Sequence, residues 1–242
     1  MNPTSLPRSA VVLVAAGNAT RMGPLAVRKP FLPLGGRTLI EVAAEPFAAL
    51  PTLAELVIVA HPDDVERMRE LVASSPVFAK VRAIVPGGAE RSDSVRLGAQ
   101  AVSANVEVIC VHDAARPLIA SAVIARAIEV AAREEVALVA IPVRDTIKVS
   151  STGTHAEHTL DRSVLWAAQT PQVFRANVLR ELCERAHADG FKPTDDAALY
   201  EQYTGPVPMV EGDAQNLKVT TPTDLVIAEA ILAARARREP TR

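Results

Sequence analysis

Short apolar runs alternate along this chain with segments in which apolar residues recur every three or four positions. The runs 10–16, 56–60, 81–85, 106–111 and 136–141 are rich in Val, Ile and Leu and predict strands. The segments with helical spacing predict these helices: 38–49, 62–74, 92–103 and 121–134. Strands separated by helix-length segments predict βαβ units and an α/β protein with a mostly parallel sheet. Ligands bind such sheets at the carboxyl ends of the strands, where the strand order reverses.

The pattern changes between residues 142 and 172. Two β-branched runs, 143–149 and 158–161, enclose the polar turn "SSTGTHAEH" and predict a long hairpin. A lone two-stranded ribbon is only marginally stable in water. We therefore expect the hairpin to pack on another surface, for which a second copy of the chain is the natural candidate.

Helical periodicity returns over 174–236, interrupted by short strands that we expect at 207–211 and 217–219. Thr221 with Asp224 three positions later predicts a capped start for the last helix. We interpret residues 1–242 as a single domain that carries the hairpin as an arm at about 142–165.

Composition limits the classes of protein that fit. Hydrophobic residues make up 49% of the chain and aromatic residues only 3%, so the core must be aliphatic. A net charge of -2 argues against a general nucleic-acid binder. The apolar stretch 10–17 is too short to span a bilayer. We read it as a first core strand and expect a cytoplasmic protein with no membrane partner.

The loop after this strand carries the first candidate chemistry. Ala15, Ala16 and Gly17 would let a ligand approach the backbone, whose amides can bind an anion, while Arg21 and Lys29 add full charges. The glycine pattern is neither a P-loop nor a dinucleotide fingerprint. A phosphate-binding loop and a merely solvated basic loop both remain open on this motif alone.

A second loop of this kind is "VPGGAERSDSV", which leads from a strand into a helix. Gly88 could contact a flat base through its backbone, and Ser94 offers a hydroxyl. Taken by itself, however, the motif favours an ordinary turn between a strand and a helix, and we expect Arg91 to be solvated rather than to bind.

The most informative motif is "HDAARP", directly beyond a fully apolar strand. Asp113 and Arg116 either pair with each other at the next helix start, or serve a ligand, with Asp113 near a divalent metal or sugar hydroxyls and Arg116 on a phosphate. We favour the ligand interpretation, because two charges beyond a buried strand need partners. His112 is expected to have a structural role.

Two further residues lie near the C-terminus. Thr194 precedes two aspartates and predicts a helix N-cap. Lys218 lies in the expected strand 217–219, where it must point either to solvent or to an anion.

Taken together, these motifs resemble those of the 2-C-methyl-D-erythritol 4-phosphate cytidylyltransferases. The resemblance covers about residues 10–235 and rests on the motifs "AAG…R…K", "PGGAERSDSV", "HDAARP", "PVRDT", "DR…LW…QTPQ", "TDDA" and "NLKVTTPTDL" in this order. It implies a Rossmann-like nucleotidyltransferase fold, CTP with Mg2+ or another divalent cation, and a homodimer whose β-hairpin arms reach into the partner's site.

The resemblance also implies roles for individual residues. Three cations are expected to act on the triphosphate: Arg21, Lys29 and Lys218. CTP contacts are expected from Ala15, Ala16, Gly17, Gly88, Ser94 and Asp113. The polyol phosphate is expected to bind Asp113, Arg116, Thr194 and Lys218, together with Thr146 and Arg162 from the partner's arm. Asp113 is also the candidate metal ligand, with the metal held mostly by the CTP phosphates.

The first loop departs from the family pattern, since Ala19 stands where a second glycine is usual and Arg28 precedes Lys29. Either cation could therefore contact the α-phosphate. The expected reaction is attack by a substrate phosphate on the α-phosphorus of CTP, with no general base. Two alternatives remain: a ribitol 5-phosphate cytidylyltransferase, and a module that binds CTP without turnover.

Overall fold

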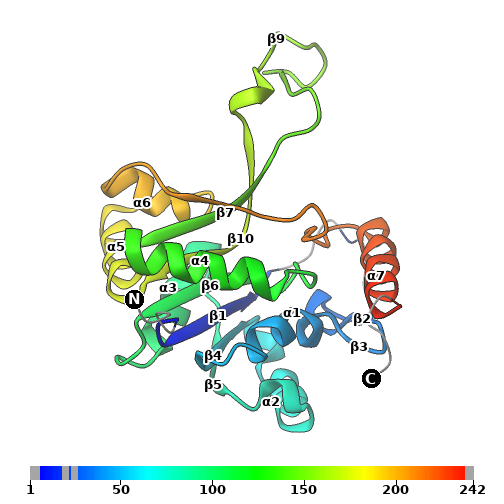
Figure 1. The fold of residues 1–242 in the computed structure, drawn as a ribbon, viewed down its shortest axis with the longest axis vertical. Coiled ribbons are helices and arrows are strands. Elements are labelled where there is room, and N and C mark those ends of the chain that lie inside the picture. The colour runs from blue at the N-terminus through cyan, green and yellow to red at the C-terminus, as the bar shows by residue number, and fades with distance from the viewer. Residues whose placement is uncertain (1–5, 18–21, 23–26, 238–242) are drawn as a thin grey trace, which may run out of the picture.

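A seven-stranded sheet forms the centre of the protein in the computed structural model, which describes residues 6–17, 22 and 27–237 (Figure 1). Its strand order is β11-β7-β10-β6-β1-β4-β5, and every strand except β10 runs in the same direction. The strands are β1 Ser9–Ala15, β4 Leu53–Ala60, β5 Val81–Pro86, β6 Val108–Asp113, β7 Val136–Pro142, β10 Trp166–Arg175 and β11 Met209–Glu211. The predicted mostly parallel α/β sheet is confirmed.

Helices cover both faces of this sheet. Those of one face are α1 Leu39–Ala48, α2 Val65–Ser74 and α4 Ser121–Glu134, and those of the other are α3 Arg91–Ala101, α5 Ala176–Asp189 and α6 Ala197–Tyr203. Successive residues of β1 point to opposite faces of the sheet: Val11 and Leu13 pack toward α1 and α4, whereas Val12 packs toward α3. The core is mainly aliphatic, as composition predicts, with Phe47 and Phe174 as its largest fully buried side chains.

Strand β10 was not foreseen. It runs antiparallel between β6 and β7, in a stretch to which we assigned no strand and whose last two residues, 174 and 175, we placed in a helical region. Its pairing with β7 shifts between Ala168 and Gln172, and the Thr170–Pro171 peptide is cis. The prediction of a strand at 217–219 is wrong. Those residues form a loop that Val219 fastens by donating its backbone N–H to the carbonyl of Ala115, at 2.7 Å.

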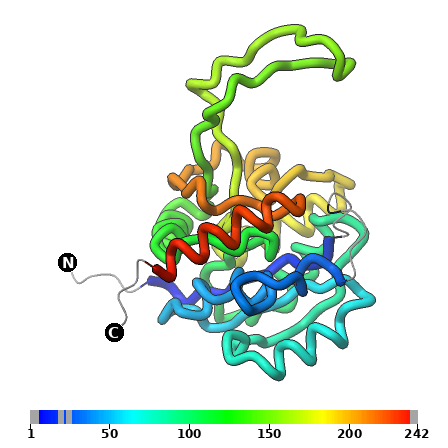
Figure 2. Tube along the Cα trace, turned by 90° about the vertical axis from the view of Figure 1, so that its right-hand side faces the viewer, coloured from blue at the N-terminus to red at the C-terminus, as the bar shows by residue number. Residues whose placement is uncertain are grey.

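The predicted hairpin projects from the sheet as an arm (Figures 1 and 2). Its regular ladder is confined to the short strands β8 Lys148–Val149 and β9 His158–Thr159, beyond which single backbone hydrogen bonds such as Leu160 to Ile147, at 3.0 Å, join the two sides. The ribbon is therefore less regular than the two β-branched runs suggest. Three large apolar side chains are exposed along its returning segment: Leu160, Val164 and Trp166.

The last helix, α7 Pro222–Ala236, packs at the far end of the molecule (Figure 1). Its predicted capping box is confirmed, because Thr221 and Asp224 each accept a backbone hydrogen bond from the other. The small apolar cluster beneath it contains Leu39, Leu118 and Val219.

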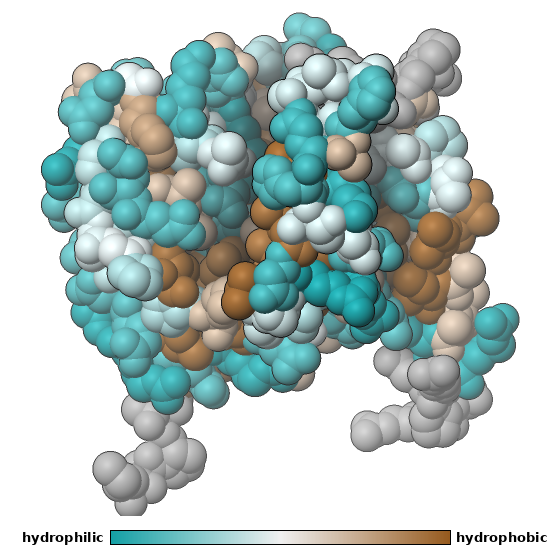
Figure 3. Space-filling model, turned by 90° about the horizontal axis from the view of Figure 1, so that it is seen from above, coloured by the Kyte–Doolittle hydropathy of each residue, from teal (hydrophilic) through white to brown (hydrophobic). Residues whose placement is uncertain are grey.

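Two large apolar residues of α7, Val226 and Ile227, are exposed. The space-filling view shows an apolar patch on its right-hand side (Figure 3). Shorter elements connect these parts: β2 Pro33–Leu34, β3 Arg37–Thr38 and the 3-10 turns Lys29–Phe31, Pro62–Asp64, Pro76–Phe78 and Arg162–Val164. Among the described helices, none has the length and apolar character to cross a membrane.

Candidate active site

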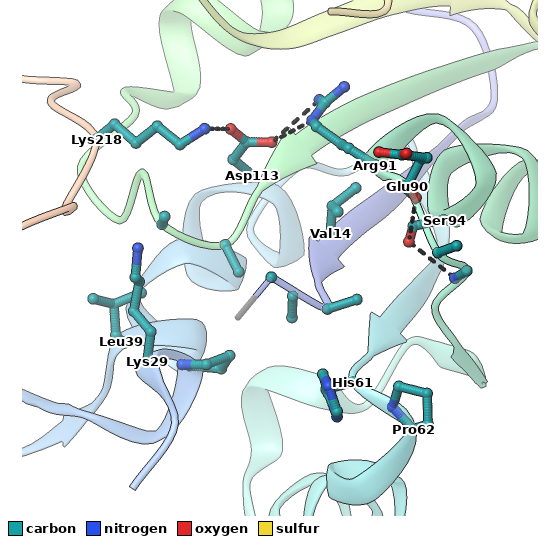
Figure 4. A pocket seen from close by; sticks show the side chains of 18 residues that line it. Val14, Lys29, Leu39, His61, Pro62, Glu90, Arg91, Ser94, Asp113 and Lys218 are labelled. Atoms are coloured by element: carbon teal, nitrogen blue, oxygen red, sulfur yellow. Dashed lines mark hydrogen bonds and ion pairs between the residues drawn. The ribbon is translucent and has the colours of Figure 1, made fainter. Parts of the chain in front are cut away.

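A cavity of about 630 Å³ opens at the carboxyl ends of β1, β4, β5 and β6 (Figure 4). Strand order reverses here, because β4 lies on one side of β1 and β6 on the other. The ends of these strands and the segments that follow them supply most of its wall, and the wall is completed by Lys29, Pro30, Leu39 and Lys218. Its lining includes six residues predicted for CTP: Ala15, Ala16, Gly17, Gly88, Ser94 and Asp113.

Lys29 and Lys218 lie at one end of this cavity (Figure 4). The Lys29 ammonium donates to the carbonyl oxygen of Val219, at 3.0 Å, so it is fastened to the segment that carries Lys218. The Lys218 ammonium lies 2.6 Å from the Oδ2 atom of Asp113. Residues far apart in the sequence therefore form one positively charged wall beside a carboxylate, as the resemblance implies.

Asp113 is the last residue of β6 and is 7% exposed. Burial opposes its ionisation, but the nearby charges of Arg91 and Lys218 outweigh burial and hold the pKa of Asp113 well below its usual range. The carboxylate is thus negative at neutral pH, with one cation at each oxygen: Lys218 at Oδ2, and Arg91 at Oδ1 at 3.2–3.3 Å.

Arg91 is not the solvated residue that we expected. Its guanidinium also donates two hydrogen bonds of 2.8 Å to the carboxylate of Asp196, which is buried at the start of α6. Sequence reasoning missed this because it considered each loop alone. The available signal was Asp196 itself, a second acidic residue in "TDDA" beyond the one that can cap a helix.

Arg116 does not pair with Asp113, so the alternative of an ion pair between them is wrong. Its guanidinium instead donates to the backbone carbonyls of Asn216, at 2.8 Å, and Ala168, at 3.2 Å. Arg116 is absent from the cavity lining. It ties the end of β6 to β10 and to the loop that leads to Lys218.

His112 is fully buried behind Asp113, and both ring nitrogens have partners. Nε2 lies 2.9 Å from the carbonyl oxygen of Arg116, and Nδ1 lies 3.0 Å from the hydroxyl of Thr170. Burial lowers the pKa of His112 to about 4. A buried neutral imidazole with both nitrogens engaged is a structural residue, as expected, and is not placed to accept a proton from a ligand.

The opposite end of the cavity is built from small residues and backbone, next to Ser94, Glu90, His61 and Pro62 (Figure 4). The Ser94 hydroxyl accepts from the amide of Gly88, at 3.1 Å, and donates to the carbonyl of Glu90, at 3.2 Å. Ser94 thus holds the loop in shape. A Cβ on Gly88 would lie 2.4 Å from that of Asp93, so this loop requires glycine there.

Arg28 and Lys29 are separated by the structure. Arg28 forms ion pairs with Asp63, at 2.8 Å, and Asp64, at 2.9 Å, whereas Lys29 lines the cavity. Of the two, Lys29 is therefore placed to meet a phosphate. The predicted residue Arg21 lies outside the described part of the chain.

The remaining predicted acceptor residues do not line this cavity. Thr146 and Arg162 are exposed on the arm, where Arg162 donates to the carbonyl of Arg144, at 2.8 Å. Thr194 is exposed and is not the N-cap: α6 begins after Asp196, and Asp195 accepts from the amide of Ala198, at 3.0 Å. His61, which sequence reasoning overlooked, does line the cavity.

Comparison with known proteins supports one family. The family model described as 2-C-methyl-D-erythritol 4-phosphate cytidylyltransferase (IspD) matches residues 9–234. A curated relative of that name from Symbiobacterium thermophilum is 45% identical, over 94% of each chain, and one from Syntrophotalea carbinolica is 41% identical, over 92% of this chain and 95% of its own. The crystal structure of the enzyme of that name from Thermus thermophilus superposes with a TM-score of 0.76 at 32% identity, covering 94% of this chain and 99% of the other.

Proposed function

Because the chain belongs to the 2-C-methyl-D-erythritol 4-phosphate cytidylyltransferase family, we propose that it transfers the cytidylyl group of CTP to 2-C-methyl-D-erythritol 4-phosphate. An oxygen of the acceptor phosphate bonds to the α-phosphorus of CTP as the bond from that phosphorus to the bridging oxygen breaks. The products are 4-diphosphocytidyl-2-C-methyl-D-erythritol and pyrophosphate. The alternatives of a ribitol 5-phosphate enzyme and a non-catalytic CTP-binding module are not favoured by these matches.

One observation carries the proposal: Lys29 and Lys218 share a single cavity with the ionised carboxylate of Asp113. The lysine end suits phosphates, and the end built from small residues suits a nucleoside. A cavity with cations at one end and small residues at the other supports the proposal that a nucleotide binds here with its triphosphate against the two ammonium groups.

Catalysis then consists of positioning and charge stabilisation. Negative charge develops on the triphosphate as pyrophosphate leaves, and Lys29 and Lys218 are placed to stabilise it. A phosphate monoester is largely ionised near neutral pH, since its second pKa is about 6. The acceptor therefore needs no general base, in agreement with the engagement of both nitrogens of His112.

We also propose that Mg2+ accompanies CTP. Among the described residues, no group of three or more His, Cys, Asp or Glu side chains could hold a metal. Mg2+ usually keeps several waters and binds through one or two carboxylates plus substrate phosphates. The carboxylate of Asp113, at the lysine end of the cavity, fits that arrangement, in which the metal would neutralise charge on the triphosphate.

We also propose that the protein forms a homodimer through its arm. The arm exposes Leu160, Val164 and Trp166, which supports contact with a second copy of the chain. In that assembly Thr146 and Arg162 would reach the partner's acceptor site, together with Arg116 and Thr194 as the resemblance implies. A sizing column run on the intact chain and on a version lacking 147–160 tests this, and monomeric elution of both would remove the arm roles. The expected cytoplasmic location stays a prediction.

The activity is tested by measuring pyrophosphate release from CTP with 2-C-methyl-D-erythritol 4-phosphate, with ribitol 5-phosphate, and with neither. Release with the first acceptor alone is expected. Faster release with ribitol 5-phosphate would support the pentitol enzyme, and tight CTP binding without release in any mixture would support a binding module.

A further inference from the structure

Asp196 is a buried carboxylate next to the cavity but not part of its wall. It is 1% exposed and is the N-cap residue directly before α6. Both of its oxygens accept hydrogen bonds from the two terminal nitrogens of Arg91, each at 2.8 Å. This bidentate geometry is the strong form of an arginine–carboxylate pair and fixes the orientation of the guanidinium.

The same guanidinium of Arg91 also binds Asp113, which lines the cavity. Its Nε and Nη2 atoms reach the Oδ1 atom of Asp113, and the other oxygen of Asp113 holds the ammonium of Lys218 (Figure 4). Charges alternate along this row, from Asp196 through Arg91 and Asp113 to Lys218. The carboxylate of Asp113 cannot rotate without lengthening a contact at one of its ends.

The start of α6 is itself held against the sheet. The backbone amide of Ala197 donates to the side-chain oxygen of Gln172 on β10, at 2.6 Å, and Ala197 is buried. Asp196 is thus anchored to the central sheet independently of its pair with Arg91. It provides a fixed end for the charged row.

We propose that Asp196 is a positioning residue of the active site, which sets the carboxylate of Asp113 and the ammonium of Lys218 through the guanidinium of Arg91. Asp196 touches no ligand in this role. The inference rests on the proposed function in that the aligned groups are those expected to meet CTP and the acceptor.

Removal of the charge on Asp196 has an effect that a purely structural role would not produce. Without its partner, Arg91 loses its fixed orientation, and the surroundings of the cavity lose one negative charge. Turnover should fall because Asp113 and Lys218 are misplaced, whereas binding of the polyanionic CTP should be retained or become tighter. Loss of folding would weaken both.

The experiment compares Asp196→Asn with Asp195→Asn, a matched control in the adjacent position whose carboxylate serves Gln172 and Ala198 and not Arg91. Turnover is measured by pyrophosphate release, and CTP affinity by calorimetry without acceptor. In Asp196→Asn we expect kcat to fall at least tenfold, while the Kd for CTP rises no more than threefold above that of wild type. In Asp195→Asn we expect kcat to stay within threefold of wild type. An Asp196→Asn enzyme with wild-type kcat, or equal losses in the two variants, would overturn the proposal.

A double-mutant cycle identifies the route. Because Asp196 acts through Arg91 on Asp113, Asp196→Asn should cause little further loss of kcat in an Asp113→Asn background, and full additivity would contradict the proposal. Should Asp196→Asn not fold, Arg91→Lys keeps the charge but not the bidentate pair, and the same tenfold loss is expected. Wild-type kcat in Arg91→Lys would overturn the inference.

The two proposals fail in different ways. The proposed function fails if the wild-type protein releases no pyrophosphate from CTP with its acceptor. The positioning role is then judged by the NMR signal of the Lys218 side chain, assigned with Lys218→Arg. That signal should shift in Asp196→Asn and not in Asp195→Asn, and an unchanged signal would refute the role.

Discussion

Lowering the pH should destabilise the protein through His112, before most carboxylates titrate. His112 is fully buried, and burial lowers its pKa from 6.5 to about 4. Between these values the unfolded chain binds a proton that the folded chain does not. The contribution of His112 to stability is therefore fully present above about pH 6.5, falls as the pH falls, and is exhausted below about pH 4.

The magnitude follows from the size of the shift. One pKa unit corresponds to about 1.4 kcal/mol, so the whole shift is worth on the order of 3 kcal/mol. Linkage places about 2 kcal/mol of this loss between pH 7 and pH 5. Burial explains the resistance to protonation, because a buried imidazolium loses its solvation. The hydrogen bond from Nε2 to the carbonyl of Arg116 favours the protonated ring and offsets this effect only in part.

Urea unfolding at pH 7 and pH 5 measures this loss. His112→Asn removes the titration, so the free energy of unfolding of wild type should fall by about 2 kcal/mol more than that of the variant. His187→Asn, at an exposed histidine on α5, serves as the control and should keep the wild-type dependence. Equal losses in wild type and His112→Asn would refute the reasoning.

Three further predictions concern charge and packing. Lys29→Ala and Lys218→Ala should each lower kcat by roughly 10²-fold, the scale of one removed electrostatic donor, and near-normal turnover in both would defeat their assignment. Arg28→Ala should lower kcat less than Lys29→Ala in the same assay, because Arg28 pairs with Asp63 outside the cavity lining; an equal or larger loss would place Arg28 at the phosphates. Gly98→Ala should destabilise the protein by about 2 kcal/mol in urea unfolding, since the new Cβ would lie 2.4 Å from a side-chain carbon of Val12 at the contact between α3 and β1, and unchanged stability would show that this contact relaxes.

The parallel part of the fold could be predicted from the sequence because its signal is local. Each βα unit carries its own apolar run, and 136–141, for example, matches β7 closely. Strand β10 carries no such signal. "WAAQTPQVF" has polar residues and a proline in its middle, and only pairing with both β6 and β7 makes it a strand.

The site shows the same division. Lys29, Asp113 and Lys218 could be predicted because each is a charge at the end or edge of an apolar segment, and the structure brings all three together. The partners of these charges could not, since Arg91 at the start of α3 and Asp196 before α6 are brought together only by the tertiary fold. The sequence of one loop shows that a charged residue there needs a partner, but it does not show which residue of the chain is that partner.

The hydrogen bond from Lys29 to the carbonyl of Val219 joins an early segment of the chain to a late one. During synthesis, the strands β1, β4, β5 and β6 emerge well before Lys218, so a ribosome-bound chain can build most of its sheet while one wall of the cavity is still missing. The chain can therefore complete its nucleotide site only near the end of translation. A fragment truncated directly after β11 would keep every strand of the central sheet in its sequence and yet lack the residue that closes the charged wall.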